Sequence, residues 1–359
     1  MPNKRIAIKI GSNVLTKKNG TLDYTRMSAL VDQIAELHNR GVEIILISSG
    51  AVAAGRSKIQ ADKLDAVSAR QLFSAIGQAE LINRYHMLFT DNGITCGQVL
   101  TTKESLGTRG HYLNQRNCMM VMIEHGVIPI VNENDTISVT ELMFTDNDEL
   151  SGLVATMMDA EKLIILSNID GIYNGNPNDP DSSVIREVLP GKRNLSAYIQ
   201  TGKSTYGRGG MQTKTNIASK VADEGIEVII ANGKRDNILI DLMDNEADTI
   251  CTRFIASPDP VSSVKKWIAH SEGFAKGEIH LDGPASQALL DEESSNSVLM
   301  VGVTEIIGNF EKDDIVKIFD ENGKQIGVGK TQYSSSEASG LIGKKGEKPI
   351  VHYDYLYLL

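Results

Sequence analysis

Residues 5–13 read RIAIKIGSN, a short apolar run with one lysine that ends in glycine, serine and asparagine. The run alternates too little for a half-exposed strand and is too short for a helix, so it predicts a buried parallel strand. Lys9 followed by Gly11 and Ser12 suits a phosphate, because glycine admits backbone N–H groups while the hydroxyl and the ammonium add a donor and a charge. The same letters also fit an ordinary Gly-Ser turn, so this stretch alone does not decide between the two interpretations.

Short apolar strands and amphipathic helices then alternate along the first two thirds of the chain. Apolar runs predict strands at 43–47, 94–100, 127–131, 162–166 and 227–230, and helical spacing predicts helices at 25–39, 66–90, 110–124 and from about 149 and 211. This alternation predicts an α/β fold with a mostly parallel central sheet between helix layers. Ligands of such sheets bind beyond the carboxyl ends of the strands. The polar residues expected at that edge are Lys9, Ser49-Gly50, Asn132 and Ser167-Asn168.

The pattern changes near residue 254, where Ser257-Pro258-Asp259-Pro260 is typical of a linker. Beyond it, apolar runs around a polar turn predict a hairpin, with further strands nearby: 315–319 and 325–329, then 298–303 and 351–358. We therefore expect a large domain at 1–254, a linker at 255–274 and a compact β-barrel-like domain with one or two short helices at 275–359.

The composition is that of a soluble globular protein, with 359 residues, 41% hydrophobic and 23% charged. A net charge of −10 argues against a general polyanion binder, and 5% aromatic residues argue against a stacking surface for single-stranded nucleic acid. The three cysteines lack CxxC spacing, which predicts neither a disulfide framework nor a metal site. Without a signal-peptide pattern or a membrane-spanning apolar run, we expect a cytoplasmic protein.

Two polar clusters follow predicted strands or precede predicted helices. Asn132-Glu133-Asn134-Asp135 fits either a turn of locally bonded side chains or a pocket for a polar zwitterion, with Asp135 for an ammonium and the amides for a carboxylate. Asp146-Asn147-Asp148 precedes a helix, and capping explains one acidic residue but not two that flank an amide. Asp148 could also orient lysines by charge pairing.

A glycine-rich loop at 206–210 leads into a helix that carries Lys214 in its first turn. Such a loop alone also fits a flexible linker. Together, however, Lys9, Lys214 and two amide-lined turns are what phosphoryl transfer requires, because cations offset the charge of the transferring group. The chain has neither a Walker A motif nor the HRD and DFG motifs of protein kinases.

Six motifs occur in order along the chain: KIGSNVLT at 9–16, SSGAVAAG at 48–55, VNEND at 131–135, DND at 146–148, GGMQTK at 209–214 and KKWI at 265–268. Together they closely resemble the amino-acid kinase family, and within it the branch that phosphorylates glutamate. The C-terminal module is similar to the PUA domain that bacterial members of this branch commonly carry.

The resemblance implies ATP-dependent phosphorylation of the L-glutamate side-chain carboxylate to L-glutamyl 5-phosphate, the first step of proline biosynthesis. It implies that Lys9 and Lys214 stabilise the transferring phosphoryl group, with Asp148 organising them. It assigns glutamate to Ser49, Gly50, Asn132, Asp135, Asp146 and Asn147. It assigns ATP, with Mg²⁺ bridging its phosphates and no metal held by protein ligands, to Lys9, Gly11, Ser12, Ser167, Asn168, Arg208, Gly209, Gly210, Met211, Gln212, Thr213 and Lys214. Family members often have Thr-Asp in place of Ser167-Asn168 and Thr in place of Arg208.

The resemblance also implies feedback inhibition by proline, a homotetramer, and glutamyl-phosphate reductase as a functional partner. The alternatives are a kinase of the same fold that acts on acetylglutamate, aspartate, carbamate or UMP, an RNA-associated PUA protein, and a nucleotide sensor without turnover. Residues 275–359 contain 8 Lys, no Arg and 14 Asp or Glu, a net charge of −6 that disfavours RNA.

Overall fold

The computed structural model describes residues 4–59, 64–103, 106, 109–137, 147–177, 179–190, 195, 210–244, 248–258, 268, 273, 275–291 and 296–359. The chain divides into two compact units, residues 1–102 with 113–260 and residues 103–112 with 261–359. The domain boundaries expected from the sequence stay predictions.

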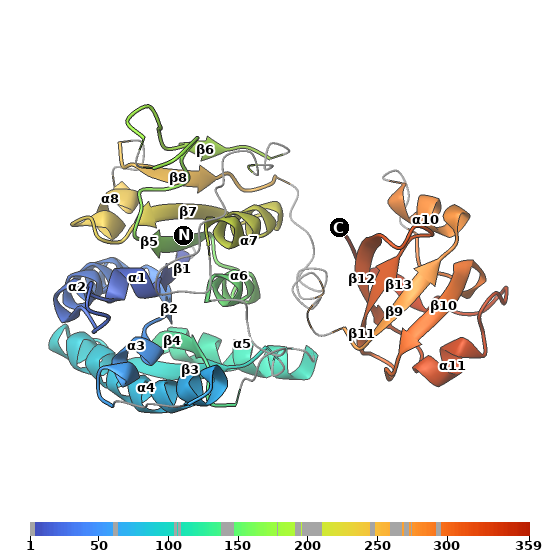
Figure 1. The fold of residues 1–359 in the computed structure, drawn as a ribbon, viewed down its shortest axis with the longest axis horizontal. Coiled ribbons are helices and arrows are strands. Elements are labelled where there is room, and N and C mark those ends of the chain that lie inside the picture. The colour runs from blue at the N-terminus through green and yellow to red at the C-terminus, as the bar shows by residue number, and fades with distance from the viewer. Residues whose placement is uncertain are drawn as a thin grey trace. The chain divides into compact units, whose positions relative to one another are not determined.

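An eight-stranded sheet forms the centre of the first unit (Figure 1). Its strands lie in the order β3 (Cys96–Thr101), β4 (Ile128–Glu133), β2 (Glu43–Ser48), β1 (Arg5–Ile10), β5 (Lys162–Ser167), β7 (Glu227–Asn232), β8 (Cys251–Phe254) and β6 (Glu187–Val188). The first six strands of this order, from β3 through β1 to β7, are parallel to one another. Strand β8 runs antiparallel to β7. The predicted mostly parallel α/β sheet is confirmed.

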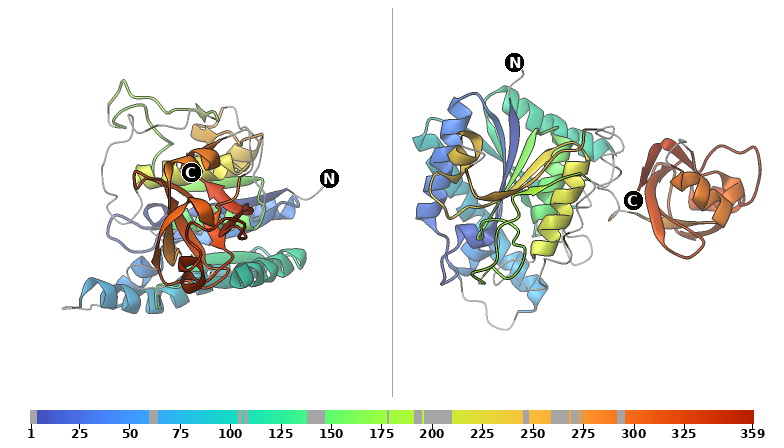
Figure 2. Two further views of the ribbon diagram at one scale, coloured as in Figure 1. Left: turned by 90° about the vertical axis from the view of Figure 1, so that its right-hand side faces the viewer. Right: turned by 90° about the horizontal axis from the view of Figure 1, so that it is seen from above.

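Helices cover both faces of this sheet, as the views in Figures 1 and 2 show. Helices α2 (Tyr24–Asn39) and α8 (Ile238–Asp244) lie on one face, and α6 (Asn147–Met157) and α7 (Met211–Asp223) lie on the other. The remaining helices of this part are α1 (Ser12–Leu15), α3 (Ala51–Arg56), α4 (Ala66–Asp91) and α5 (Arg109–Glu124).

The alternation of side chains along β1 directs Lys9 to one face. Ile6, Ile8 and Ile10 belong to the apolar core that includes residues of α2. Because neighbouring side chains of a strand point to opposite faces, Lys9 points to the other face, which α6 covers. The strand therefore brings one buried ammonium group beneath the first turn of α6.

The second unit contains a five-stranded sheet in the order β10 (Val303–Gly308), β9 (Gly277–Leu281), β11 (Ile315–Phe319), β12 (Gln325–Thr331) and β13 (Val351–Leu358). Helices α10 (Gly283–Leu290) and α11 (Ser335–Ser339) accompany it. Strands β11 and β12 form the predicted antiparallel hairpin. The strand predicted at 298–303 is wrong, because residues 300–302 form a 3₁₀ turn in which Gly302 packs closely against Ala285 of α10.

No helix in the described part of the chain combines the length and the apolar character that crossing a bilayer requires.

Candidate active site

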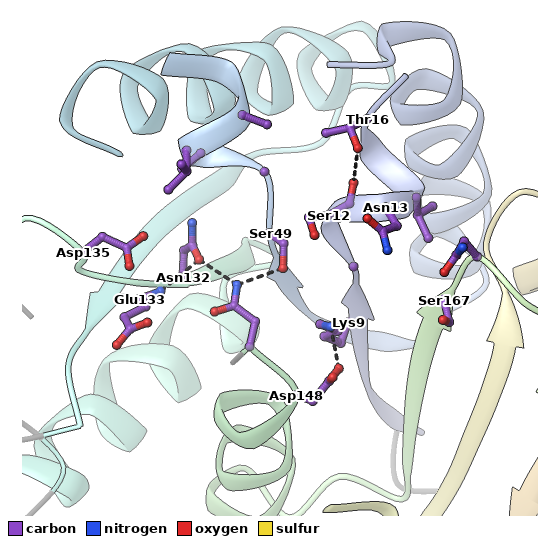
Figure 3. Close-up of a pocket in the computed structure, with 18 of the residues that line it drawn as sticks. Lys9, Ser12, Asn13, Thr16, Ser49, Asn132, Glu133, Asp135, Asp148 and Ser167 are labelled. Carbon is purple, nitrogen blue, oxygen red and sulfur yellow. Dashed lines mark hydrogen bonds and ion pairs between the residues drawn. The ribbon is translucent and has the colours of Figure 1, made fainter. Parts of the chain in front are cut away.

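One buried carboxylate holds two lysines that lie far apart in the sequence. The Asp148 Oδ1 atom is 2.5 Å from Lys9 Nζ, and its Oδ2 atom is 2.9 Å from Lys214 Nζ. Asp148 is fully buried at the start of α6, and Lys9 is 4% exposed. Figure 3 shows Lys9 pointing from β1 toward this carboxylate. Three elements, β1, α6 and α7, thus meet in one charged cluster.

The charge state of Asp148 follows from its two neighbours. Burial alone would raise the pKa of this carboxyl, because desolvation disfavours the charged form. The positive charges of Lys9 and Lys214, and the hydrogen bonds they donate, outweigh burial and lower the pKa to about 2. The carboxylate is therefore ionised at neutral pH, and the three groups together carry one positive charge.

The cluster opens into a cavity of about 770 Å³ at the carboxyl ends of the central strands. The predicted site residues that line it are Lys9, Gly11, Ser12, Ser49, Gly50, Asn132, Asp135, Asn147, Asp148, Ser167, Asn168, Gly210, Met211 and Lys214. Gln212 and Thr213 are described but do not line it, and the Gln212 amide donates instead to Asn216 on the surface of α7. Asp146, Arg208 and Gly209 lie outside the described residues.

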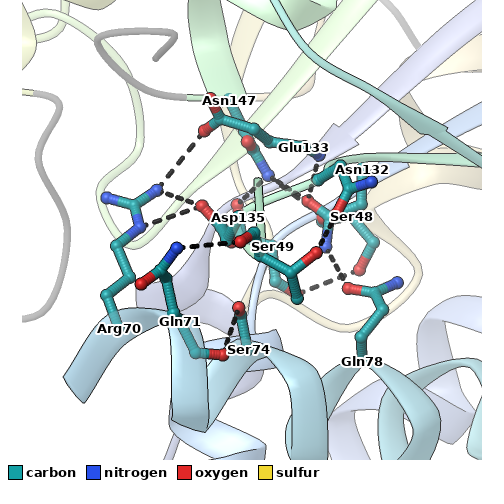
Figure 4. A network of polar contacts seen from close by, with 12 residues as sticks. Ser48, Ser49, Arg70, Gln71, Ser74, Gln78, Asn132, Glu133, Asp135 and Asn147 are labelled. Atoms are coloured by element: carbon teal, nitrogen blue, oxygen red, sulfur yellow. Dashed lines mark hydrogen bonds and ion pairs between the residues drawn. The ribbon is translucent and has the colours of Figure 1, made fainter. Parts of the chain in front are cut away.

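A network of amides forms the middle of the cavity wall (Figure 4). The Asn147 Nδ2 atom lies 3.1 Å from Ser49 Oγ, 3.1 Å from the Ser48 carbonyl oxygen and 2.9 Å from Asn132 Oδ1. Asn132 in turn donates to Gln78 Oε1 at 2.8 Å. These bonds fix the amide side chains, so they are already oriented to bind a polar ligand.

Sequence reasoning missed Arg70, which lies on α4 and lines the same cavity. Its Nε donates to Asp135 Oδ1 at 2.9 Å, and its Nη2 lies 3.3 Å from Glu133 Oε2. Asp135 was expected to meet a substrate ammonium, and here it pairs with a guanidinium. One signal could have found Arg70, because residues 70, 74 and 78 form a polar stripe at helical spacing that faces the VNEND motif.

The loops around Lys9 and Lys214 contribute differently to the site. The Gly11 N–H donates to the Leu166 carbonyl oxygen, and a Cβ on Gly11 would lie 3.2 Å from that oxygen, so glycine permits the close approach of this loop to β5. Helix α7 begins after Gly210 without a side-chain cap. Its first N–H groups and the positive end of its dipole therefore add to the charge of Lys214.

The donor set also bears on a metal ion. Among the described residues, no three His, Cys, Asp or Glu side chains are grouped so that they could hold one. Mg²⁺ is commonly held by one or two carboxylates together with substrate phosphates and water.

The chain is similar to known proteins over nearly its whole length. Residues 4–232 match the amino acid kinase family, and residues 277–353 match the PUA domain. A glutamate 5-kinase from Bacteroides thetaiotaomicron is 70% identical over 355 residues, 99% of this chain and 98% of that protein. A glutamate 5-kinase from Chlorobaculum tepidum is 45% identical over 361 residues, again 99% and 98%. The solved structure of a carbamate kinase from Giardia lamblia bound to AMP-PNP shares the fold, with a TM-score of 0.52, 16% identity, and coverage of 71% of this chain and 99% of that one.

Proposed function

Because the chain belongs to the amino acid kinase family, and to the glutamate 5-kinases within it, we propose that this enzyme phosphorylates the side-chain carboxylate of L-glutamate. The reaction uses ATP and gives L-glutamyl 5-phosphate and ADP. The observation that supports it most strongly is the contact of Lys9 and Lys214 with opposite oxygens of Asp148 at the wall of one cavity.

In the proposed step, a side-chain carboxylate oxygen of glutamate attacks the γ-phosphorus while the bond to the β,γ-bridging oxygen breaks. That oxygen leaves with ADP, and no proton moves, because the attacking carboxylate is already ionised at neutral pH. Catalysis then consists of positioning and of offsetting the charge on the phosphoryl oxygens. Lys9 and Lys214 supply the positive charge, and Asp148 holds them at a fixed separation.

Nucleotide binding is proposed for the side of the cavity formed by the start of α7 and the end of β5. Gly210 and Met211 offer the uncapped helix terminus, and Ser167 and Asn168 line the wall nearby. Mg²⁺ bound to the phosphates would offset part of their charge. Arg208 and Gly209 stay predicted contacts of the nucleotide.

Glutamate binding is proposed for the amide side of the cavity. Asn132, Asn147 and Ser49 form one bonded group there, and Asp135 lies beyond it. The side-chain carboxylate of glutamate would point toward Lys9, and the end with the α-carbon would point toward Asp135. Asp146 stays a predicted contact.

The finer expectations also remain proposals. We propose that the reaction is the first step of proline biosynthesis, that proline inhibits it, and that the protein acts in the cytoplasm as a homotetramer. An acyl phosphate is labile, so glutamyl-phosphate reductase is the proposed consumer of the product.

The test is an assay of the full chain with ATP, Mg²⁺, L-glutamate and hydroxylamine, which converts an acyl phosphate to a coloured hydroxamate. We expect glutamate-dependent hydroxamate formation and a lower rate with proline. ADP release, which reports transfer to any acceptor, should be slow with N-acetylglutamate, aspartate, carbamate or UMP. A faster reaction with any of these four acceptors than with glutamate would contradict the proposed substrate.

A further inference from the structure

We propose that Arg70 binds the α-carboxylate of the substrate, while Asp135 and Glu133 beside it receive the α-ammonium group. The inference rests on the proposed function and adds a residue that selects α-amino acids over other carboxylates. The observation behind it is that Arg70 on α4 contacts two acidic side chains at and just after the end of β4, Glu133 and Asp135.

The guanidinium of Arg70 is only partly occupied by its partners. Its Nε and Nη2 atoms contact Asp135 and Glu133, whereas its Nη1 atom has no hydrogen-bond partner among the described residues. Figure 4 shows one edge of the guanidinium turned toward the two acids and the other turned away from them. The Arg70 side chain is 22% exposed, compared with 8% for Asp135, so the cation remains open to the cavity.

The charges match an α-amino acid better than they match an ammonium or a carboxylate alone. Arg70 and Asp135 pair a cation with an anion, as an α-amino acid does, so an ammonium group beside Asp135 would gain a carboxylate partner. A carboxylate on the same carbon would then face Asp135 and Glu133 and be repelled, unless a cation lay beside them. Arg70 supplies that cation, and its Nη1 atom can donate to a carboxylate oxygen while Nε and Nη2 keep their contacts with the two acids.

The distance between Arg70 with its two acids and the lysine cluster indicates how long a substrate must be to reach both. Glu133 is adjacent in sequence to Asn132, which accepts a hydrogen bond from Asn147, and Asn147 is adjacent to Asp148. The amide network therefore separates the Arg70 pair from the lysine cluster within one cavity. A substrate with a zwitterionic α-carbon at one end and a carboxylate at the other matches this separation.

A purely structural role for Arg70 predicts a different result. If the ion pairs only tied α4 to β4, removing them would lower stability and change activity with all acceptors alike. If Arg70 binds the α-carboxylate, its removal matters only for acceptors that possess that group. The test therefore compares L-glutamate with 4-aminobutyrate, which lacks the α-carboxylate and keeps the ammonium and the reacting carboxylate.

The variants are Arg70→Gln, Arg70→Lys and the matched control Arg84→Gln. Arg84 lies on the same helix, packs over the Tyr24 ring and does not line the cavity. Hydroxamate formation gives kcat and KM for each acceptor and for ATP, and thermal unfolding reports whether each variant is folded.

For Arg70→Gln we expect the KM for glutamate to rise about 10- to 100-fold, the range for loss of a charged hydrogen bond, with the KM for ATP unchanged. The preference for glutamate over 4-aminobutyrate in kcat/KM should fall by a similar factor. Arg70→Lys, which keeps the charge with fewer N–H donors, should fall between the wild type and Arg70→Gln. Arg84→Gln should match the wild type.

An unchanged preference in Arg70→Gln would overturn the inference and leave Arg70 a structural tie. Should that variant not fold, an unchanged preference in Arg70→Lys would overturn it equally. A wild-type protein that is inactive with glutamate would contradict the proposed function instead. Calorimetric binding of glutamate and 4-aminobutyrate to the wild type and Arg70→Gln would then decide the role of Arg70 separately, with loss of the preference supporting it.

Discussion

At the residue scale, the separation of the two ammonium groups depends on Asp148. Each of its oxygens contacts a different lysine, and neither lysine is close to it in the sequence. The contact of these three residues could be predicted from the sequence, because two lysines expected at one site need an anion to position them. Arg70 was missed although it belongs to a polar stripe on α4, because the strand that this stripe meets depends on how the helix crosses the sheet.

Removing either lysine should affect turnover far more than folding. We expect Lys9→Ala and Lys214→Ala to lower kcat by about 10²- to 10³-fold, as loss of one donor to a transition-state charge does in other enzymes. Hydroxamate assays give kcat, and circular dichroism checks the fold. Near-normal turnover of a folded variant would remove that lysine from the mechanism.

Replacing Asp148 by a neutral residue should lower the stability of the fold, because Lys9 and Lys214 would then repel each other. Asp148→Asn leaves Lys9 and Lys214 without their shared counter-charge, so we expect the melting temperature at pH 7 to fall by about 10 °C. ATP should raise the melting temperature more in this variant than in the wild type, because phosphates replace the missing anion. Thermal unfolding with and without ATP measures both effects, and equal ATP shifts would contradict this reasoning.

The same carboxylate predicts how stability depends on pH. Its pKa of about 2 in the folded protein lies below the ordinary value of 3.8, so its ionisation stabilises the fold above about pH 4. That contribution is lost as the pH falls through this interval toward 2. The difference in melting temperature between the wild type and Asp148→Asn should therefore shrink mainly between about pH 4 and pH 2. A constant difference would show that Asp148 does not titrate as described.

At the element scale, the site depends on the close packing of α3 against α4. A Cβ on Gly77 would lie 1.7 Å from the Ala51 carbonyl oxygen, and one on Gly55 would lie 1.8 Å from that of Phe73. Helix α3 begins just after Ser49 and Gly50, and α4 carries Arg70. The distance between these helices therefore sets the shape of the amide side of the cavity.

Gly77→Ala should push the two helices apart. We expect a lower melting temperature and a KM for glutamate raised by about tenfold, with the KM for ATP changed less, because α7 and β5 are not displaced. Gly110→Ala is the matched control, since a Cβ there meets nothing within 4 Å and alanine favours the helix. If Gly77→Ala and Gly110→Ala had the same KM for glutamate, the packing of α3 against α4 would not influence glutamate binding, and this prediction would be contradicted.

The long elements could be predicted because apolar runs and helical spacing are strong in them. The 25–39 prediction matches α2 within one residue, and 66–90 matches α4. Two short strands, β6 and β8, were not predicted, because two to four residues carry too little pattern. Residues 298–303 were predicted wrongly, because the 3₁₀ turn there has buried Met300 between exposed Leu299 and Val301, and apolar residues in such a turn show the same composition as a strand.

At the scale of the whole molecule, the sequence indicated a mostly parallel sheet but not its strand order. The order depends on which crossovers the chain makes, and pattern alone does not record them. Placement of Lys9, Asn132 and Ser167 along one edge nevertheless followed from the rule that ligands of parallel sheets bind at the carboxyl ends of strands.

The charge of the C-terminal module leads to a prediction about RNA. Residues 275–359 carry a net charge of −6, which opposes contact with a phosphate backbone. We expect no shift of a structured RNA by the full chain in a gel at physiological salt and roughly 10 µM protein, above most specific dissociation constants. Binding below 1 µM would contradict this and favour an RNA-associated role.

The central claim is that the protein directs a glutamate carboxylate oxygen onto the γ-phosphorus of ATP. Glutamate labelled with ¹⁸O in its side-chain carboxylate tests this, because hydroxylamine attacks the acyl carbon of the product and releases phosphate that keeps the attacking oxygen. ³¹P NMR distinguishes labelled from unlabelled phosphate. We predict that the phosphate formed carries one ¹⁸O atom from glutamate, whereas unlabelled phosphate would show that another acceptor receives the phosphoryl group.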